Sequence, residues 1–451
     1  MIALICAHML ALLAAAGPVR ASTLVDPAFF GQHLENYPAF GSICGESGSS
    51  CPAPPWGVSS IRLWDSGVTW CTLEPSKGQY NWAPLDRWLR YAATAKGGAA
   101  ADLVYTFGNP PGWAVGLTGG CLPTQPGIVP DETEWRNFVT ALVQHTCSGC
   151  AQIKYYEPWN EWDSSWAGTT AQMVSFTHDV AQAAHGQSPG SMVLTPSVSA
   201  YDGNCSGAGC KNLENFLQAD PAATGDVDIV NVHTYPTNSN NGGSWPEVEV
   251  PRQQSLYDWI NKVRNSAMQP NGYASHPLCS TEGSWGKNSS WPDYNNDSSN
   301  HGQRAFVARY DLALISLGVS RAYWYAYSNP SWGTLWTAPS TLQQGGFTPG
   351  GIATNQLEKT GATPGWLSGA TLTAPCSKDA SSGLWTCDIT RPTSYAGRIM
   401  WVESGTLSVP TPSGYTTLRP LCGSSQPAPS TLTVTTEPIL VDNSGYSGQC
   451  Q

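Results

Sequence analysis

The feature that most restricts the fold is a repeated alternation, between residues 26 and 368, of short apolar runs and amphipathic segments. Eight of the runs have the length and the β-branched or aromatic content of buried strands. These runs are 29–34, 59–65, 101–108, 153–160, 191–199, 227–235, 277–283 and 320–328. Helical patterns lie between them, at 85–95, 132–146, 170–184, 213–218, 255–267 and 302–317. Eight such units predict a (β/α)8 TIM barrel, in which functional side chains gather at the carboxyl ends of the strands.

The pattern changes after residue 368. Helical periodicity ends, and short runs of alternating apolar and polar residues follow, with turn signals at roughly ten-residue spacing. We therefore predict an α/β chain with a barrel over 22–368 and a C-terminal antiparallel β-sandwich over 369–451.

The first residues resemble a targeting segment. The apolar run 2–16 is too short to span a bilayer comfortably, and small residues ending at Ala21 follow it. We expect 1–21 to be a signal peptide and the mature chain to be secreted, extracellular or periplasmic, without a membrane partner. The formal net charge of −11 argues against nucleic acid as a partner, because nucleic acid attracts basic patches.

Cysteine usage agrees with export. Removal of Cys6 with the signal peptide leaves 13 of the 14 cysteines, and most of these lie in polar, Gly/Ser-rich segments. Disulfides are favoured over a zinc site, because the one C-x2-C pair has no second half. We predict no metal and no cofactor. The expected disulfides are Cys44–Cys51, Cys71–Cys121, Cys147–Cys150, Cys205–Cys210, Cys376–Cys387 and Cys422–Cys450.

One cysteine is left over. Cys279 lies on the seventh predicted strand, three residues before Glu282. Strand alternation turns Leu278, Ser280 and Glu282 inward, so Cys279 is expected to be a free thiol that faces the helix layer.

Two glutamates lie at the ends of predicted strands. Glu161 ends the fourth and Glu282 the seventh, and these two strand ends face each other across the mouth of a barrel. Two carboxylates about 5–5.5 Å apart suit retaining glycoside hydrolysis. Glu157 lies roughly 13 Å deeper along the strand and is expected to be a buried acid paired with Arg62. Either strand-end glutamate alone is also compatible with a solvated loop residue.

Several motifs, in this order, resemble clan A glycoside hydrolases, and in particular glycoside hydrolase family 39 or a near relative. The motifs are RLWDSGVTWCTLEPSKGQYNW, KYYEPWNE, VNVHTYP, TEG and RIMWVESG. The resemblance implies that Glu161 is the general acid/base and Glu282 the nucleophile. The family usually has proline after the acid/base, whereas Trp162 follows here, which leaves the substrate open.

The resemblance also implies a set of substrate-binding residues. Asn160 would bind the sugar 2-hydroxyl, and Trp324 would form the platform under the sugar. The other expected binding residues are His33, Asp65, Arg62, His233, Tyr235 and Trp285. For His33, a buried structural histidine is the alternative. Donation from Tyr235 and Arg62 is expected to keep Glu282 ionised, and this charge would raise the pKa of Glu161.

The expected partner is an oligosaccharide or polysaccharide, and a monomer is favoured. The first substrate hypothesis is β-xylosidase-like exo action, and endo-acting hydrolysis of an exopolysaccharide or glucan is the alternative. A catalytically silent carbohydrate-binding protein is the rival from another class. Three N-x-S sequons, at Asn204, Asn288 and Asn296, would matter only if the source glycosylates exported proteins.

Overall fold

The computed structural model describes residues 22–34, 57–118, 120–121, 129–188, 190–199, 212–236, 245–247, 255–287, 301–329, 331–336, 347–360 and 364–444. The expected signal peptide, the three sequons and Cys44, Cys51, Cys205, Cys210 and Cys450 lie outside these residues. Within the described part of the chain, no helix is both long enough and apolar enough to cross a membrane.

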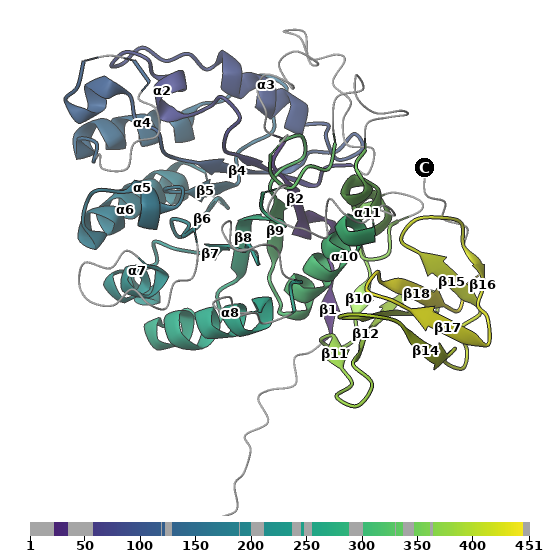
Figure 1. Ribbon diagram of the computed structural model, residues 1–451. Coiled ribbons are helices and arrows are strands. Elements are labelled where there is room, and N and C mark those ends of the chain that lie inside the picture. Colours follow the sequence, from purple (N-terminus) through teal and green to yellow (C-terminus); the bar gives the residue numbers. More distant parts are fainter. Residues whose placement is uncertain are drawn as a thin grey trace, which may run out of the picture.

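Eight parallel strands form the first unit (Figure 1). Their order is β6-β5-β4-β3-β2-β9-β8-β7, and a parallel bridge between Leu194 and Ile229 joins the two ends of the sheet. The strands are β2 (Phe30–Gln32), β3 (Ser60–Leu63), β4 (Asp102–Thr106), β5 (Tyr155–Glu157), β6 (Met192–Val193), β7 (Val230–His233), β8 (Leu278–Gly283) and β9 (Arg321–Trp324). Each lies within one of the eight predicted runs, so the predicted (β/α)8 barrel is confirmed.

The helices surround this sheet (Figure 1). The α-helices are α2 (Trp70–Leu73), α3 (Ala83–Ala92), α4 (Glu132–Gln144), α5 (Trp162–Ser165), α6 (Thr170–Gln187), α7 (Leu213–Ala219), α8 (Leu256–Lys262), α10 (His301–Ser316) and α11 (Pro349–Glu358). Short 3-10 turns occupy Pro27–Phe29, Gly112–Val115, Ala222–Thr224 and Gln269–Asn271, and a π-helix over Val263–Met268 continues α8.

Local sequence explains where several helices begin. The Asp131 side chain accepts the N–H groups of Thr133 and Glu134 at the start of α4. A capping box of Thr169 and Gln172 starts α6. The sequence pattern did not predict α11, because its PGGIATNQLE segment has two glycines and weak helical periodicity.

The C-terminal residues form antiparallel sheets, as predicted for the β-sandwich. One sheet has the order β1-β10-β12-β13-β18-β15-β16, with β11 beside β12, and the other pairs β14 with β17. The strands are β1 (Thr23–Leu24), β10 (Thr371–Leu372), β11 (Ser377–Lys378), β12 (Leu384–Arg391), β13 (Tyr395–Val402), β14 (Leu407–Pro410), β15 (Thr417–Pro420), β16 (Gln426–Pro427), β17 (Thr431–Val434) and β18 (Ile439–Asp442). The sequence pattern placed residues 23–24 with the barrel, but β1 pairs with β10 of this second unit.

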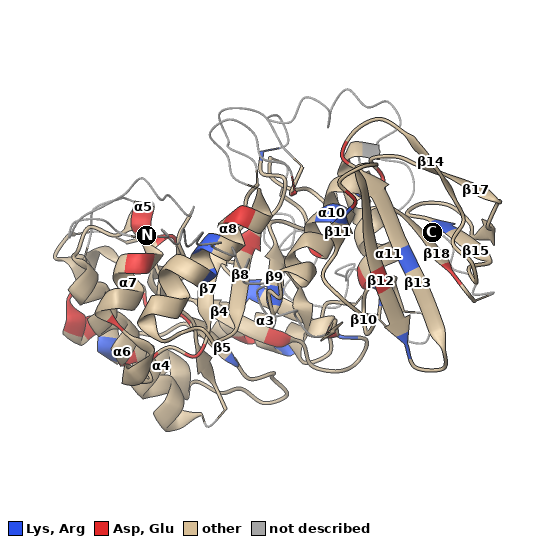
Figure 2. Ribbon diagram, turned by 90° about the horizontal axis from the view of Figure 1, so that it is seen from below, with Lys and Arg blue, Asp and Glu red and all other residues tan. Residues whose placement is uncertain are grey.

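The two units pack directly against each other. Arg309 of α10 and Glu247 form a buried ion pair, and the ring of Trp245 lies 3.8 Å from the guanidinium. Trp401 of β13 donates its indole N–H to Glu247 at 2.7 Å. The few charged residues are scattered along both units (Figure 2).

Three of the expected disulfides are present among the described cysteines. They join Cys71 to Cys121, Cys147 to Cys150 and Cys376 to Cys387, with Cα–Cα distances of 5.2, 5.5 and 4.5 Å. The remaining expected pairs involve cysteines outside the described residues.

Cys279 is a free, buried thiol, but it does not face the helix layer. It packs in the barrel interior, in a cluster whose other members are Val104, Tyr155, Leu194, Ile229 and Tyr323. Its neighbour Ser280 points outward instead, where its hydroxyl contacts Thr234 at 2.5 Å. The predicted orientation of Cys279 is therefore wrong, because an irregularity in the register of β8 after Ser280 breaks the strict alternation of side chains.

Candidate functional site

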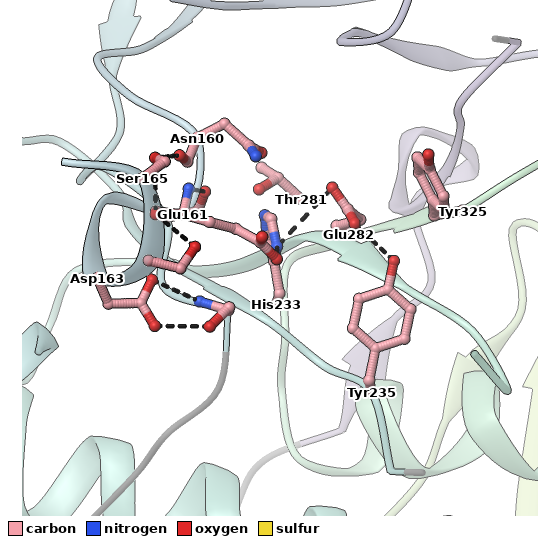
Figure 3. Close-up of polar contacts among 12 residues, drawn as sticks. Asn160, Glu161, Asp163, Ser165, His233, Tyr235, Thr281, Glu282 and Tyr325 are labelled. Atoms are coloured by element: carbon pink, nitrogen blue, oxygen red, sulfur yellow. Dashed lines mark hydrogen bonds and ion pairs between the residues drawn. The ribbon is translucent and has the colours of Figure 1, made fainter. Parts of the chain in front are cut away.

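Three titratable side chains meet at the carboxyl ends of the strands (Figure 3). Glu161 follows β5, His233 ends β7, and Glu282 lies near the end of β8. One carboxylate oxygen from each glutamate and a ring nitrogen of His233 all lie within 4.8 Å of one another. The structure thus brings together two glutamates that are 121 residues apart (282 − 161).

Arg62 is the central cation beneath this group. Its Nε and Nη2 donate to the two oxygens of Glu157 at 2.7 and 2.8 Å. Its Nη2 also donates to Asn160 Oδ1 at 2.7 Å, and its Nη1 donates to Glu282 Oε2 at 2.9 Å. Burial alone would lower the pKa of Arg62, but Glu157 and Glu282 outweigh it and hold the pKa above its usual range. A permanently charged guanidinium therefore fixes the positions of three side chains.

Glu157 belongs to the barrel interior, as predicted. The residue is completely buried, and besides Arg62 it accepts a hydrogen bond from Thr106 Oγ1 at 2.9 Å. Its pairing with Arg62 leaves it without access to the opening. Glu157 is thus a structural acid.

Glu282 is the deeper carboxylate of the pair, with 10% of its side chain exposed. Tyr235 donates its hydroxyl to Glu282 Oε1 at 2.6 Å (Figure 3). Arg62 donates to the other oxygen. Burial raises the pKa of Glu282, and the charges of His233 and Arg62 together with the Tyr235 hydrogen bond only partly oppose the rise. This direction is opposite to the sequence-based expectation, which gave weight to the donors and none to burial.

Glu161 is the more accessible carboxylate, with 27% of its side chain exposed. His233 Nδ1 donates to Glu161 Oε1 at 3.0 Å and lies 3.8 Å from Glu282 Oε2. Burial works to raise the pKa of Glu161, but the hydrogen bond and charge of His233 outweigh it and lower the pKa, again opposite to expectation. Burial alone would lower the pKa of His233. Glu282 and Glu161 raise this pKa by a larger amount, so the net shift is upward. The two shifts together favour the arrangement in which the proton is on His233 Nδ1 and the negative charge is on Glu161.

His33 lies behind the site and not at its surface. The ring is fully buried, and its Nε2 lies 2.8 Å from the carbonyl oxygen of Thr281. Because a carbonyl can only accept, Nε2 carries the proton. Burial and the charge of Arg62 lower the pKa of His33 well below its usual value, which keeps the ring neutral. In this position His33 supports β8 and has no access to solvent.

Asp65 and Tyr325 form the opposite rim of the opening. Asp65 is exposed and accepts a hydrogen bond from the Tyr325 hydroxyl at 2.9 Å. The Tyr325 ring packs edge-on against His33, and Trp332 lies nearby with its ring centre 5.6 Å from that of Tyr235. The sequence pattern identified Asp65 but missed Tyr325.

Trp324 and Trp285 do not reach the opening. Trp324 is only 5% exposed, donates its indole N–H to the Gly333 carbonyl at 2.6 Å and packs against Trp285 and Tyr310. Trp285 is fully buried. Both positions differ from the expected sugar contacts. Alternation along β9 turns Tyr323 into the barrel and Trp324 outward, so the next residue, Tyr325, takes the position at the mouth.

Among the residues that the structure describes, two groups of side chains each bring together three atoms that could bind a metal. The first is Glu161, His233 and Glu282, but Arg62 already places a positive charge 2.9 Å from Glu282. The second is Asp86 with Cys147 and Cys150, whose sulfurs are bonded to each other and so are not thiolate ligands.

Comparison with known proteins supports the fold. No protein-family model matches the sequence, and a search of curated proteins finds no match. A family 39 glycoside hydrolase from the gut symbiont Bacteroides cellulosilyticus WH2 has a TM-score of 0.61 at 15% identity, covering 92% of this chain and 81% of that one. A bifunctional glucanase–xylanase protein from a metagenome library has a TM-score of 0.58 at 14% identity, covering 93% and 96%.

A second family 39 enzyme, from Xanthomonas axonopodis pv. citri, has a TM-score of 0.55 at 14% identity and covers 94% of this chain and 95% of that one. The similarity to all three structures extends over nearly the whole chain. The chain therefore has a fold shared with clan A glycoside hydrolases, and family 39 enzymes are among the structures that share it.

Proposed function

We propose that the protein is an exported retaining glycoside hydrolase that acts through Glu282 as nucleophile and Glu161 as general acid/base. The observation that carries the proposal is the pair of carboxylates at the mouth of the barrel, with oxygens within 4.8 Å of each other. Retaining enzymes hold their two carboxyl groups about 5–5.5 Å apart, whereas inverting enzymes need about 6.5–9.5 Å to admit a water.

In the first step, a Glu282 oxygen attacks the anomeric carbon while the bond to the leaving oxygen breaks. Arg62 and Tyr235 both donate to Glu282, so its ionised form is the form that they bind. The leaving oxygen takes its proton from Glu161, which is the more exposed carboxylate. Glu161 receives that proton from His233 Nδ1, which lies 3.0 Å from its Oε1, so the imidazole becomes neutral in this step.

In the second step, Glu161 acts as a base. Its carboxylate takes a proton from water, the water oxygen bonds to the anomeric carbon, and the bond to Glu282 breaks. Two inversions at the same carbon give net retention. The proton returns to the Glu161–His233 pair, which is ready for the next substrate.

The rim residues would hold the sugar. Arg62 binds the Asn160 amide oxygen, and this contact orients the amide nitrogen as a donor for the sugar 2-hydroxyl. Tyr325 replaces Trp324 as the aromatic platform in this proposal, because only Tyr325 lies at the opening. Asp65, held by the Tyr325 hydroxyl, would accept from another sugar hydroxyl.

The substrate is an oligosaccharide or polysaccharide in this proposal. β-Xylosidase-like exo action is the first hypothesis, on the sequence resemblance to family 39. Endo-acting hydrolysis of an exopolysaccharide or glucan is the second, and the fold is shared with a structure named as a glucanase–xylanase. A silent carbohydrate-binding protein is disfavoured, because a lectin has no need for a carboxylate with two donors beside an accessible second carboxylate.

The test begins with a panel of aryl glycosides and polysaccharides, with the products sized. Glu282→Ala should abolish turnover, and azide should restore it by forming a glycosyl azide of inverted configuration. Azide should rescue Glu161→Ala with retention instead. Glu132→Ala, on the exposed face of α4, is the matched control and should turn over like the wild type. Near-normal turnover in Glu282→Ala would contradict the proposal.

A further inference from the structure

Ser197, in the segment that follows β6, makes a concentrated set of hydrogen bonds to the turn that carries Glu161. Its hydroxyl accepts the backbone N–H of Glu161 at 2.9 Å and lies 3.5 Å from the carbonyl oxygen of Trp159. Its own N–H donates to that same carbonyl at 3.0 Å. Its carbonyl accepts the N–H of Trp162, also at 3.0 Å. Ser197, which is fully buried, thus forms hydrogen bonds with the backbone before, at and after Glu161.

The backbone of Glu161 needs such support. Its φ of 46° and ψ of 55° are left-handed, a conformation that a residue with a Cβ adopts at a cost. This conformation turns the N–H toward Ser197 while the side chain extends to His233. Without the Ser197 hydroxyl, the Glu161 N–H loses its acceptor, and the turn is freer to relax toward an ordinary conformation.

The same segment also supports the partner of the Glu161 side chain. The carbonyl of Val198 accepts the backbone N–H of His233 at 3.2 Å, and His233 Nδ1 in turn donates to Glu161. The next residue, Ser199, donates both its N–H and its hydroxyl to Asp163 at 2.9 and 2.6 Å. Ser197 and Val198 therefore support the backbone of Glu161 and the backbone of His233, whereas Ser199 bonds only Asp163.

We propose that Ser197 is a positioning residue for general acid/base catalysis. Its hydroxyl fixes the backbone of Glu161 and thereby the distance between the Glu161 carboxyl and the leaving oxygen. The inference rests on the proposed function. Proton transfer requires heavy atoms within about 2.6–3.2 Å, so a small displacement of Glu161 weakens acid catalysis before it affects attack by Glu282.

The dependence on the leaving group tests this proposal. Phenyl and 2,4-dinitrophenyl β-D-xylosides are compared, or the same pair on the sugar that the wild type cleaves fastest. Phenol needs a proton to leave and dinitrophenol does not. In Ser197→Ala, kcat/KM should fall roughly tenfold for the phenyl glycoside and less than about twofold for the dinitrophenyl glycoside.

The ratio of the two rates in one preparation does not depend on how much of the protein is folded, so partial instability of a variant leaves the test intact. Ser199→Ala is the matched control, because its hydroxyl bonds Asp163 and not Glu161. It should keep the wild-type ratio. Ser197→Thr retains the hydroxyl and should also keep that ratio.

Three results would overturn the inference: a wild-type ratio in Ser197→Ala, the same change in Ser199→Ala, or an equally changed ratio in Ser197→Thr. Glu161→Ala separates this failure from failure of the proposed function. If Glu161→Ala cleaves the phenyl glycoside normally, Glu161 is not the acid and the proposed function fails. If Glu161→Ala shows the leaving-group effect and Ser197→Ala does not, only the role of Ser197 is wrong.

Discussion

Arg62 and Glu157 form a two-point ion pair inside the barrel, with nitrogen–oxygen distances of 2.7 and 2.8 Å and no exposed side-chain surface. The same guanidinium also holds Asn160 and Glu282. The interior pair thus serves two purposes. It neutralises a buried charge, and it fixes the position of the guanidinium that donates to Glu282, the proposed nucleophile.

Replacement of the two acidic partners of Arg62 should separate stability from chemistry. Glu157→Gln removes the charge that balances a fully buried guanidinium, so the free energy of unfolding should fall by about 3 kcal/mol while turnover remains measurable. Glu282→Gln should remove turnover by roughly 10³-fold or more with little loss of stability. Denaturant unfolding and initial rates on both variants check this, and loss of turnover in a normally stable Glu157→Gln would reverse the two roles.

The spacing of Glu161 and Glu282 predicts the stereochemistry. With oxygens within 4.8 Å of each other, the two carboxylates leave no room for a water between Glu282 and the anomeric carbon. The first product should therefore have the anomeric configuration of the substrate. Proton NMR during the first minutes of hydrolysis measures this, and a signal from the opposite anomer that precedes mutarotation would rule out double displacement.

The pH profile of kcat/KM should be bell-shaped. The acidic limb reports ionisation of Glu282, and because burial raises its pKa this limb should lie above the usual range of a glutamate. The basic limb reports loss of the proton shared by His233 and Glu161, and the raised pKa of His233 extends it upward. His233→Asn should therefore move the basic limb to lower pH. An unchanged basic limb in that variant would show that His233 does not hold the proton.

The apolar runs were sufficient to predict the eight strands and which strand ends would face each other. For this reason Asn160 and Glu282 both accept hydrogen bonds from Arg62, Tyr235 donates to Glu282, and Glu161 lies close to Glu282. These predictions depended only on where each strand ends. An error of one residue in that position would still leave the side chain at the same end of the barrel.

Predictions that depended on side-chain direction were less secure. Cys279 was assigned to the wrong face, because a register irregularity exchanges the two sides of a strand and gives no sequence signal. Trp324 was taken from the family resemblance as the sugar platform, but it lies one residue before the aromatic side chain near the site, Tyr325. The rule of alternation from Tyr323 would have found Tyr325. Ser197 had no signal at all, since its role depends on hydrogen bonds between loops that are distant in the sequence.

Asp311 on α10 and Glu358 on α11 are two buried carboxyl groups that lie close enough for the charge of one to affect the other. Both are nearly fully buried, and the Gln32 amide lies 3.4 Å from Glu358. Burial raises the pKa of each carboxyl well above its usual value, and Asp311 raises that of Glu358 further. A carboxyl whose pKa is raised by folding stabilises the protein below its unfolded pKa, and this contribution is lost as pH rises through the folded pKa.

Asp311→Asn should therefore stabilise the protein at neutral pH. The amide needs no proton to stay uncharged, so we expect Tm to rise by on the order of 2 °C at pH 7–8 and to change less near pH 4, where Asp311 is protonated anyway. Asp379→Asn is a control of opposite sign, since hydrogen bonds from Ser381 and Ser382 lower the pKa of this exposed residue to about 2. Thermal melts across the pH range decide the matter, and a lower Tm for Asp311→Asn at pH 8 would count against a buried acidic pair.

Cys279 should be unreactive in the native protein. Burial raises the pKa of its thiol, and the interior of the barrel excludes reagents. Alkylation without reductant should label Cys279 only after denaturation, and it should label no other cysteine if the remaining twelve form the six expected disulfides. Peptide mapping of native and denatured samples checks this. A disulfide peptide that contains Cys279 would show that the pairing is different.

The pairing of β1 with β10 affects the sequence in which parts of the chain can fold during synthesis. Thr23 and Leu24 find their partners, Leu372 and Thr371, only after the whole barrel sequence has been synthesised. Residues 23–24 therefore cannot pair until residues 371–372, which follow the barrel, have been made. A segment that starts at residue 369 would lack this strand and leave β10 as an open sheet edge. A fragment cut between the two units therefore does not contain every strand of the C-terminal sheet.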